Sequence, residues 1–377
     1  MAKKIRLTKS AIQPLADWKA LANLDVKDRK LLWFLSKNYR LPYTFLAEQI
    51  GLSKDSVKYR IQKLEQAGLI LSKTFLVNPV WIGHEYVTVF LSFQNLTMEK
   101  EQSLVQFFLN HPATNIVYRL AGKWQIWWGI DARDLIELDE FLNDCKIACG
   151  TYLKEYEILP ASKEYKWANL IPAITQDLNL GPLMYSKNDF SFEKDILSSP
   201  PLELRHGQGI ALTSIELDLI SALNENSNIT ADQLCVQLNL SKDTVRKLIQ
   251  KLIYSGAANA FWPFFNYKKL GLETYVMCIK LKYLNESWDQ KLTKFIQNHP
   301  WIRMGVKVIG SWDVLLEIPC KNTAHFYELL DEFREEFSEI IQTYESFPIA
   351  DYLYFNATRA LINNERRPKQ SWLQPKL

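Results

Sequence analysis

Residues 52–57 read Leu-Ser-Lys-Asp-Ser-Val, and residues 240–245 read Leu-Ser-Lys-Asp-Thr-Val, a nearly identical stretch 188 positions later. The same offset relates further landmarks: Gly83 to Gly271, His111 to His299, Gly122 to Gly310, Trp124 to Trp312 and Pro160 to Pro348. Matching residues would not keep one constant offset over about 135 residues by chance. The chain therefore contains two copies of one unit, at about 24–160 and 212–348. A period this long indicates a duplicated domain and not a solenoid.

The repeated stretch follows a position where the chain must turn sharply. That position is Gly51 in the first copy and Asn239 in the second, and these two residue types most easily adopt a left-handed backbone. Ser53 and Ser241 then stand where a helix needs an N-cap. A helix, a tight turn and a Ser-capped helix form the layout of a helix-turn-helix.

The Ser-capped helix has an apolar side and a basic side. Val57, Ile61 and Leu64 recur at helical spacing and are predicted to face the core. The other side is predicted to be largely exposed and to bind double-stranded DNA, with basic groups on phosphates and base edges. The predicted DNA-binding residues are Ser53, Lys54, Ser56, Lys58, Tyr59, Arg60 and Lys63, and in the second copy Ser241, Lys242, Thr244, Arg246, Lys247 and Lys251.

The rest of each copy has the order strand, helix, strand, strand, helix, strand, which predicts a ferredoxin-like unit. In the first copy we expect strands at 86–93, 116–120, 124–130 and 152–159 and helices at 103–110 and 135–146. In the second copy we expect strands at 274–281, 304–309, 312–318 and 341–347 and helices at 290–298 and 325–336. The predicted fold class is therefore α+β.

These elements give five predicted regions. They are a helix-turn-helix domain at 20–76, a ferredoxin-like domain at 77–165, a linker at 166–209, a second helix-turn-helix domain at 210–264 and a second ferredoxin-like domain at 265–360. The ends, 1–20 and 363–377, are basic and are predicted to be solvated.

Composition narrows the class of protein. A net charge of +3 is only weakly basic, so a DNA-binding chain must gather its basic residues locally. The five cysteines have neither disulfide-framework nor zinc-finger spacing, and Cys145 and Cys149 read as helix-packing residues. No apolar run is long enough for a membrane helix. We therefore predict a cytoplasmic protein without cofactor, metal site or catalytic residues.

The ordered set of landmarks resembles the Lrp/AsnC, or feast/famine, family of transcriptional regulators over about 270 residues. The residues that carry the resemblance include Leu24, Asp25, Asp28, Gly51, Ser53, Val57, Arg60, Leu64, Gly68, Gly83, His111 and Gly122, with Gly310-Ser311-Trp312-Asp313 matching a Gly-x-aromatic-Asp motif of the family. The resemblance implies winged-helix-type DNA-binding domains and ferredoxin-like sensor domains that pair through their sheets. It leaves open a pairing inside one chain, as a pseudo-dimer, or with a second chain, as a homo-oligomer.

The resemblance also implies a small effector, usually an amino acid, bound near the Gly-x-aromatic-Asp turn. The implied effector-binding residues are Gly122, Trp124, Gly310, Trp312 and Asp313. Three positions depart from the family pattern: Gln125 stands where Asp is usual, Leu248 matches Arg60, and Thr213 matches Asp25. We therefore expect the two copies to differ both in DNA contact and in effector binding.

Three alternatives remain open. Siroheme decarboxylases resemble the same family and use basic residues, above all His, on a tetrapyrrole's carboxylates. None of the five histidines of this chain lies in the strand-turn-strand segments 113–131 and 301–318, and His111 and His299 read as helix caps. An architectural protein would use the same basic helices without sequence preference. In the third alternative, the second helix-turn-helix binds a protein partner.

Overall fold

The computed structural model describes residues 24–180 and 211–366 except Gly256. The predicted basic start, most of the predicted linker, His206 and residues 367–377 lie outside the described residues. No helix within the described ranges is long and apolar enough to cross a membrane.

Each copy begins with three helices, and the last two of them form the predicted helix-turn-helix. They are α2 (Val26–Lys37), α3 (Tyr43–Ile50) and α4 (Lys54–Gln66) in the first copy, and α7 (Ser214–Glu225), α8 (Ala231–Leu238) and α9 (Lys242–Tyr254) in the second. Capping boxes start α2, α7 and α8, because a side chain at the N-cap and one three residues later satisfy each other's backbone N–H groups. Strands β1 (Ile70–Val77) and β6 (Ala258–Phe265) follow the third helices and pair with each other.

The first ferredoxin-like domain has the predicted order of elements, and it is called the first sensor domain below after the role that the family resemblance implies. It consists of β2 (Glu85–Phe93), α5 (Met98–Asn110), β3 (Thr114–Leu120), β4 (Ile126–Ala132), α6 (Leu135–Cys149) and β5 (Leu153–Trp167). The antiparallel strand order is β3-β4-β2-β5. Alternate strand residues and the inner faces of α5 and α6 form one apolar core that also holds Cys145 and Cys149.

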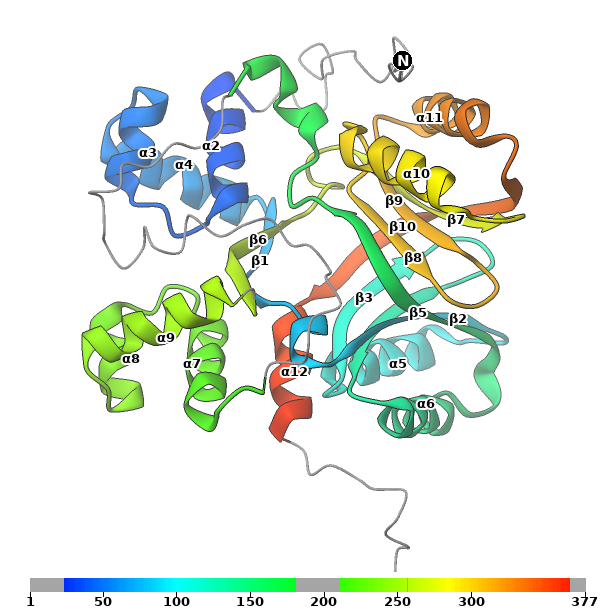
Figure 1. The fold of residues 1–377 in the computed structure, drawn as a ribbon, viewed down its shortest axis with the longest axis horizontal. Coiled ribbons are helices and arrows are strands. Elements are labelled where there is room, and N and C mark those ends of the chain that lie inside the picture. The colour runs from blue at the N-terminus through cyan, green and yellow to red at the C-terminus, as the bar shows by residue number, and fades with distance from the viewer. Residues whose placement is uncertain (1–23, 181–210, 256, 367–377) are drawn as a thin grey trace, which may run out of the picture. The chain divides into compact units, whose positions relative to one another are not determined.

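The second sensor domain repeats this order. It consists of β7 (Glu273–Leu281), α10 (Glu286–Asn298), β8 (Met304–Val308), β9 (Val314–Cys320), α11 (Thr323–Phe337) and β10 (Ile341–Phe355), followed by α12 (Ala357–Arg366). Its strand order is β8-β9-β7-β10, again antiparallel. Figure 1 shows α10 and α11 on one side of this sheet.

Both last strands run about eight residues past their predicted ends. The predictions ended them at 159 and 347, whereas β5 ends at Trp167 and β10 at Phe355. The second half of β5 lies beside β8, and the second half of β10 beside β3, so tertiary pairing extends them. Helices α5 and α10 begin earlier than predicted because Thr97 and Asn285 cap them.

The chain divides into two compact units that do not coincide with the two copies. Unit one holds residues 24–73, 162–180 and 261–349, so α2–α4 belong with the second sensor domain. Unit two holds residues 74–161, 211–260 and 350–366, so α7–α9 belong with the first sensor domain and α12. Each unit thus combines the front of one copy with the back of the other.

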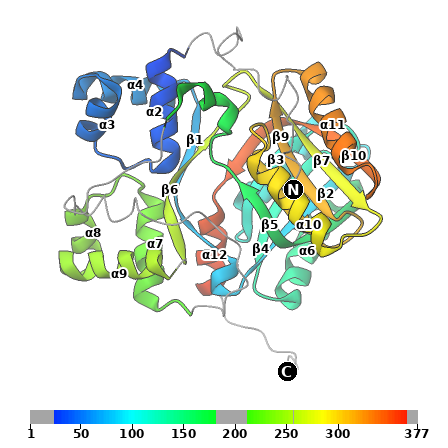
Figure 2. The same ribbon diagram turned by 45° about the horizontal axis from the view of Figure 1, so that its top comes forward.

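The segments that follow β5 and β10 are ordered parts of these units. Two short 3-10 helices, Pro172–Ile174 and Gln176–Leu178, lie in a stretch predicted as linker. Helix α12 includes residues 363–366, which were predicted as solvated tail, and it packs against α7, β3 and β4. Figures 1 and 2 both show α12 beside α7. Buried apolar residues such as Ile171, Ile174 and Leu361 explain why these segments dock.

Each sheet buries one polar pair, and the two pairs differ. In unit one the Arg303 guanidinium lies 2.5 Å from the Glu317 carboxylate, and both side chains are fully buried. In unit two the equivalent of Arg303 is Asn115, whose amide donates to Asp131 at 2.8 Å. A Cβ atom at Gly129, the equivalent of Glu317, would clash with the Asn115 side-chain oxygen. The Asn115–Asp131 pair therefore requires glycine at position 129, where unit one has the Glu317 carboxylate.

Candidate nucleic-acid interface

Local backbone chemistry places the two third helices as predicted. Gly51 and Asn239 both adopt the left-handed conformation, at φ +65° and +52°. Ser53 Oγ then accepts the Ser56 N–H at 3.1 Å, and Ser241 Oγ accepts the Thr244 N–H at 3.2 Å. The two serine caps therefore begin α4 and α9 at the predicted positions.

The apolar side of α4 is buried and its basic side is exposed. Val57, Ile61 and Leu64 are buried, which confirms the predicted core face. Lys54, Lys58 and Lys63 are exposed, and Tyr59 is 67% exposed. Among the residues that the structure describes, no carboxylate forms an ion pair with these three lysines. The ammonium groups of α4 are therefore available to an external anion.

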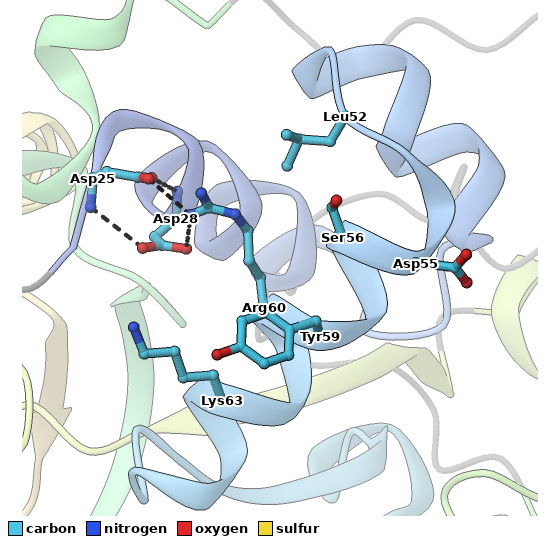
Figure 3. A pocket seen from close by; sticks show the side chains of 8 residues that line it. All are labelled: Asp25, Asp28, Leu52, Asp55, Ser56, Tyr59, Arg60 and Lys63. Carbon is cyan, nitrogen blue, oxygen red and sulfur yellow. Dashed lines mark hydrogen bonds and ion pairs between the residues drawn. The ribbon is translucent and has the colours of Figure 1, made fainter.

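Arg60 has a different place from its neighbours. Its guanidinium lies 2.6 Å from Asp28 and 2.8 Å from Asp25, the N-terminal residues of α2, and its side chain is only 25% exposed. Figure 3 shows Arg60 reaching toward both carboxylates, at the edge of a depression of about 580 Å³ that Ser56, Tyr59 and Lys63 also line. The prediction that Arg60 is largely exposed is wrong, because the N-terminal turn of α2 supplies two acceptors for it.

Electrostatics hold this ion pair together. The Asp28 carboxylate, followed by Asp25, raises the pKa of the Arg60 guanidinium above its usual range. Burial alone would raise the pKa of Asp25, but hydrogen bonds from the Asp28 backbone and from Arg60 lower it below its usual value. Asp25 and Arg60 are therefore charged at neutral pH, and the ion pairs of Arg60 attach α4 to α2.

Helix α9 carries its charges differently. Lys242 pairs with Asp232 at 2.5 Å, Lys247 with Asp243 at 2.7 Å and Lys251 with Glu216 at 2.6 Å. Ser241 and Thr244 are exposed, and Arg246 is half-buried. The first two pairs are highly exposed, so an external phosphate competes with them at small energetic cost. Lys242, Lys247 and Lys251 of α9 are nonetheless paired with carboxylates of the protein, unlike the three lysines of α4.

The Lys251–Glu216 pair replaces the Arg60 cluster of the first copy. Glu216 matches Asp28, but Thr213 and Leu248 stand where Asp25 and Arg60 do. The second copy thus lacks both the arginine and one of its two acidic partners. Lys251 forms an ion pair with the remaining carboxylate, that of Glu216. The sequence contained this signal, because two residues that form a pair differ together between the copies. The contact itself was not predicted.

The turns after β3 and β8 carry the predicted effector residues. In the second copy, Asp313 Oδ2 accepts the Leu281 N–H at 2.8 Å, and Oδ1 lies 3.3 Å from Lys280 Nζ. In the first copy, Gln125 Oε1 accepts the matching N–H of Phe93 at 2.8 Å. Gln125 therefore keeps the backbone contact that Asp313 makes, without its negative charge.

Gly122 and Gly310 have φ values of +116° and +141°, which favour glycine in these turns. Trp124 and Trp312 are buried, at 1% and 7% exposure, and Trp124 stacks on Phe90. Both indoles therefore serve as packing residues in this conformation. The ligand contacts in these turns remain a prediction.

The described histidines are engaged inside the fold. His111 and His299 end α5 and α10, and each Nδ1 accepts a backbone N–H two residues later at 3.3 Å. Burial lowers the pKa of His299, so this ring is neutral at pH 7. His84 Nε2 lies 2.8 Å from Glu365, and His325 Nδ1 accepts the Lys321 N–H. Within the described ranges, no three His, Cys, Asp or Glu side chains are grouped to hold a metal ion.

Comparison with known proteins identifies a matching family model and several relatives of this chain. A family model described as winged helix-turn-helix DNA-binding matches residues 24–70. A proline dehydrogenase transcriptional activator of Rhodobacter capsulatus is 31% identical over 124 residues, which is 32% of this chain and 79% of that protein. The HTH-type transcriptional regulator LrpA of Pyrococcus horikoshii is 36% identical over 66 residues, 18% of this chain and 47% of LrpA.

Most of this chain, with residues of both copies, is similar in fold to a solved structure. The crystal structure of the siroheme decarboxylase NirDL covers 90% of this chain and 96% of its own, with a TM-score of 0.56 and 11% sequence identity. At this identity the likeness concerns the fold.

Proposed function

Because this chain belongs to the Lrp/AsnC family of helix-turn-helix transcriptional regulators, we propose that it binds specific sites in double-stranded DNA and regulates transcription. Helices α4 and α9 are the proposed reading helices, each entering a major groove. Two such helices in one chain supply the pair that two subunits would otherwise supply. On this proposal the protein needs neither a catalytic residue nor a cofactor.

The exposed basic face of α4 is the observation that supports the proposal most. Lys54, Lys58 and Lys63 project from one helix, and phosphate contacts from such groups supply most of the affinity for DNA. Ser53, Ser56 and the exposed Tyr59 ring lie among them and have the chemistry to contact phosphate or base edges. Arg60 was predicted to contact DNA, but its ion pair with Asp28 favours a role in holding α4 against α2.

Helix α9 is proposed to contribute less affinity than α4. Its lysines must leave carboxylate partners before they neutralise a phosphate, and this exchange reduces the net gain. Ser241, Thr244 and Arg246 remain proposed contacts at its start. The two half-sites should therefore differ in sequence and in strength.

A small effector is proposed to act at the sensor turns. Asp313 offers a carboxylate beside Gly310 and Trp312, whereas Gln125 offers a neutral amide beside Gly122 and Trp124. A ligand with a cationic group, such as the ammonium of an amino acid, would distinguish the two turns. We propose that the second turn binds such a ligand more tightly.

In-vitro selection from random duplex DNA tests this function, followed by a salt titration of the selected site. We expect an enriched asymmetric motif bound roughly 10³-fold or more tightly than random DNA at fixed salt. Tight binding without a motif would instead identify an architectural protein. Absence of DNA binding would refute the proposal. An absorbance spectrum with stoichiometric tetrapyrrole would then favour the decarboxylase alternative.

A further inference from the structure

We propose that the regulatory connections of this protein are crossed, so that each sensor domain controls the helix-turn-helix of the other copy. A ligand at the second sensor would be transmitted to α2–α4, and a ligand at the first sensor to α7–α9. This inference rests on the proposed function for the role of the helices. The coupling itself is a property of the free protein.

In unit one, the segment after β5 holds helix α2. Arg29 of α2 is 5% exposed, donates to the Ile174 carbonyl at 2.9 Å and forms an ion pair with Asp177. At the other end of α2, the Asn169 amide donates to the Ser36 carbonyl at 3.2 Å. The segment thus contacts both ends of the helix that carries the Asp25 and Asp28 carboxylates.

The same segment is bonded to the second sensor domain. The Ala168 N–H donates to the Arg303 carbonyl at 2.7 Å, and the Ala173 N–H donates to the Pro300 carbonyl at 3.1 Å. The buried Tyr267 hydroxyl, just before β7, donates to the Asn169 carbonyl at 2.8 Å and accepts the Ile171 N–H at 3.1 Å. A shift of β8 or of residues 300–303 would therefore reach α2 through buried hydrogen bonds.

In unit two, helix α12 and strand β1 hold α7. The Asn224 side chain of α7 pairs with both backbone groups of Phe75, accepting at 3.1 Å and donating at 3.2 Å. Thr358 of α12 donates to the same Phe75 carbonyl at 2.8 Å. Arg366, at the end of α12, lies 2.8 Å from Asp218 of α7.

Helix α12 is in turn bonded to the first sensor domain. The Asn356 N–H donates to the Asn115 carbonyl at 2.8 Å. The Asn363 amide donates to the Pro112 carbonyl at 3.0 Å, and the Asn364 amide to the Asp131 carbonyl at 2.5 Å. These hydrogen bonds connect α12, and through it α7 of the second copy, to the sensor domain of the first copy.

The two connections are counterparts in the repeat. Ala168 and Asn356 are 188 residues apart, as are Arg303 and Asn115, so the same backbone bond forms in each unit. The segments that make it differ, since one forms 3-10 turns and the other a regular helix. The same backbone hydrogen bond is thus present in both units although the sequence and conformation of the two segments differ. We therefore regard this bond as a structural feature of each unit. It gives each sensor its own partner helices.

Hydrogen-exchange mass spectrometry of the full chain, without ligand or DNA, tests the crossing. Leu104 of α5 and Leu292 of α10 occupy the same repeat position and are both buried, so Leu104→Ala and Leu292→Ala are matched cavity variants. We expect Leu292→Ala to raise exchange of slow α2 amides roughly tenfold and to leave α7 unchanged, and Leu104→Ala to do the reverse. Faster exchange in the same copy's helices, or equal change in both, would overturn the proposal.

Milder variants at the connections provide a test that does not perturb a core. Because coupling is reciprocal, Asp177→Asn should loosen both α2 and residues 300–304, and Arg366→Gln should loosen both α7 and β3. A change confined to the helix would contradict the coupling. DNA binding is measured separately, so crossed exchange without DNA binding would refute only the proposed function, and uncrossed exchange with DNA binding would refute only this inference.

Discussion

The two helix-turn-helix regions have the same backbone but different electrostatics. In the first, Arg60 holds α4 to Asp25 and Asp28 of α2, and the remaining lysines of α4 have no carboxylate partner among the described residues. In the second, Lys251 takes the role of that arginine toward Glu216, and further lysines of α9 pair locally. A duplicated motif can therefore keep its fold while one copy loses part of its free positive charge.

The two sheets differ in the same way. Unit one buries a full ion pair, Arg303 and Glu317, between aromatic rings that include Phe264 at 4.7 Å. Unit two buries the shorter Asn115 and Asp131. Equivalent positions thus tolerate different charges only because the partner position changes as well.

The largest expected effect concerns the buried ion pair. Arg303→Met leaves the Glu317 carboxylate buried and uncompensated, which should destabilise unit one by about 3–5 kcal/mol. Urea denaturation followed by exchange of β8 and β9 amides measures this. Arg303→Met combined with Glu317→Leu should recover most of the loss. If the single variant were as stable as the parent chain, the pair would not be buried as described.

The second prediction compares the two reading helices directly. Replacing Lys54, Lys58 and Lys63 with Ala should reduce DNA affinity roughly 10²-fold at about 0.15 M salt and lower the salt slope by about three. The matched triple variant of Lys242, Arg246 and Lys251 should cost less. A binding titration at several salt concentrations checks both. Equal losses would contradict the assignment of α4 as the stronger reader.

The third prediction concerns the pH dependence of unit two. Burial raises the pKa of Asp131 from 3.8 to about 8, and the Asn115 hydrogen bond only partly opposes this. The folded carboxyl therefore keeps its proton up to about pH 8, whereas the unfolded one loses it near 3.8. Unfolding releases a proton in this window, so this group makes stability fall as pH rises through it.

Asp131→Asn should remove that dependence and stabilise unit two at pH 7 by on the order of 1 kcal/mol. Denaturation at pH 5 and pH 8 provides the measurement. The equivalent of Asp131 in unit one is Pro319, which does not titrate, so β9 exchange in the same samples is an internal control. If the difference in stability between pH 5 and pH 8 were the same in Asp131→Asn as in the parent chain, Asp131 would be ruled out as its source.

The smallest effect is expected at Arg60. Arg60→Leu introduces the residue of the second copy and should destabilise α2–α4 by about 1 kcal/mol, with the salt slope of DNA binding nearly unchanged. Adding Asp25→Thr completes the second-copy arrangement and should recover part of this loss. Unchanged stability together with a salt slope lower by about one would show instead that Arg60 contacts a phosphate.

Elements set by local chemistry were predictable. The turns at Gly51 and Asn239, the serine caps and the buried face of Val57, Ile61 and Leu64 depend on residues within a few positions of each other. Both βαββαβ orders were predicted for the same reason. The position of the Arg60 guanidinium was not, because its acceptors lie 32 and 35 residues away and periodicity reports only the helix face.

The sequence by itself determined the duplication, the fold of each part and the basic face of each reading helix, because repeats, caps and hydrophobic spacing are local properties. Only the tertiary structure decided which parts belong together. Strands β5 and β10 continue past their predicted ends into the other unit, and the segments after them bind α2 and α7. These choices depend on hydrogen bonds and buried surfaces between residues more than a hundred positions apart, such as Arg29 with Ile174 and Asn356 with Asn115, and no local pattern encodes them.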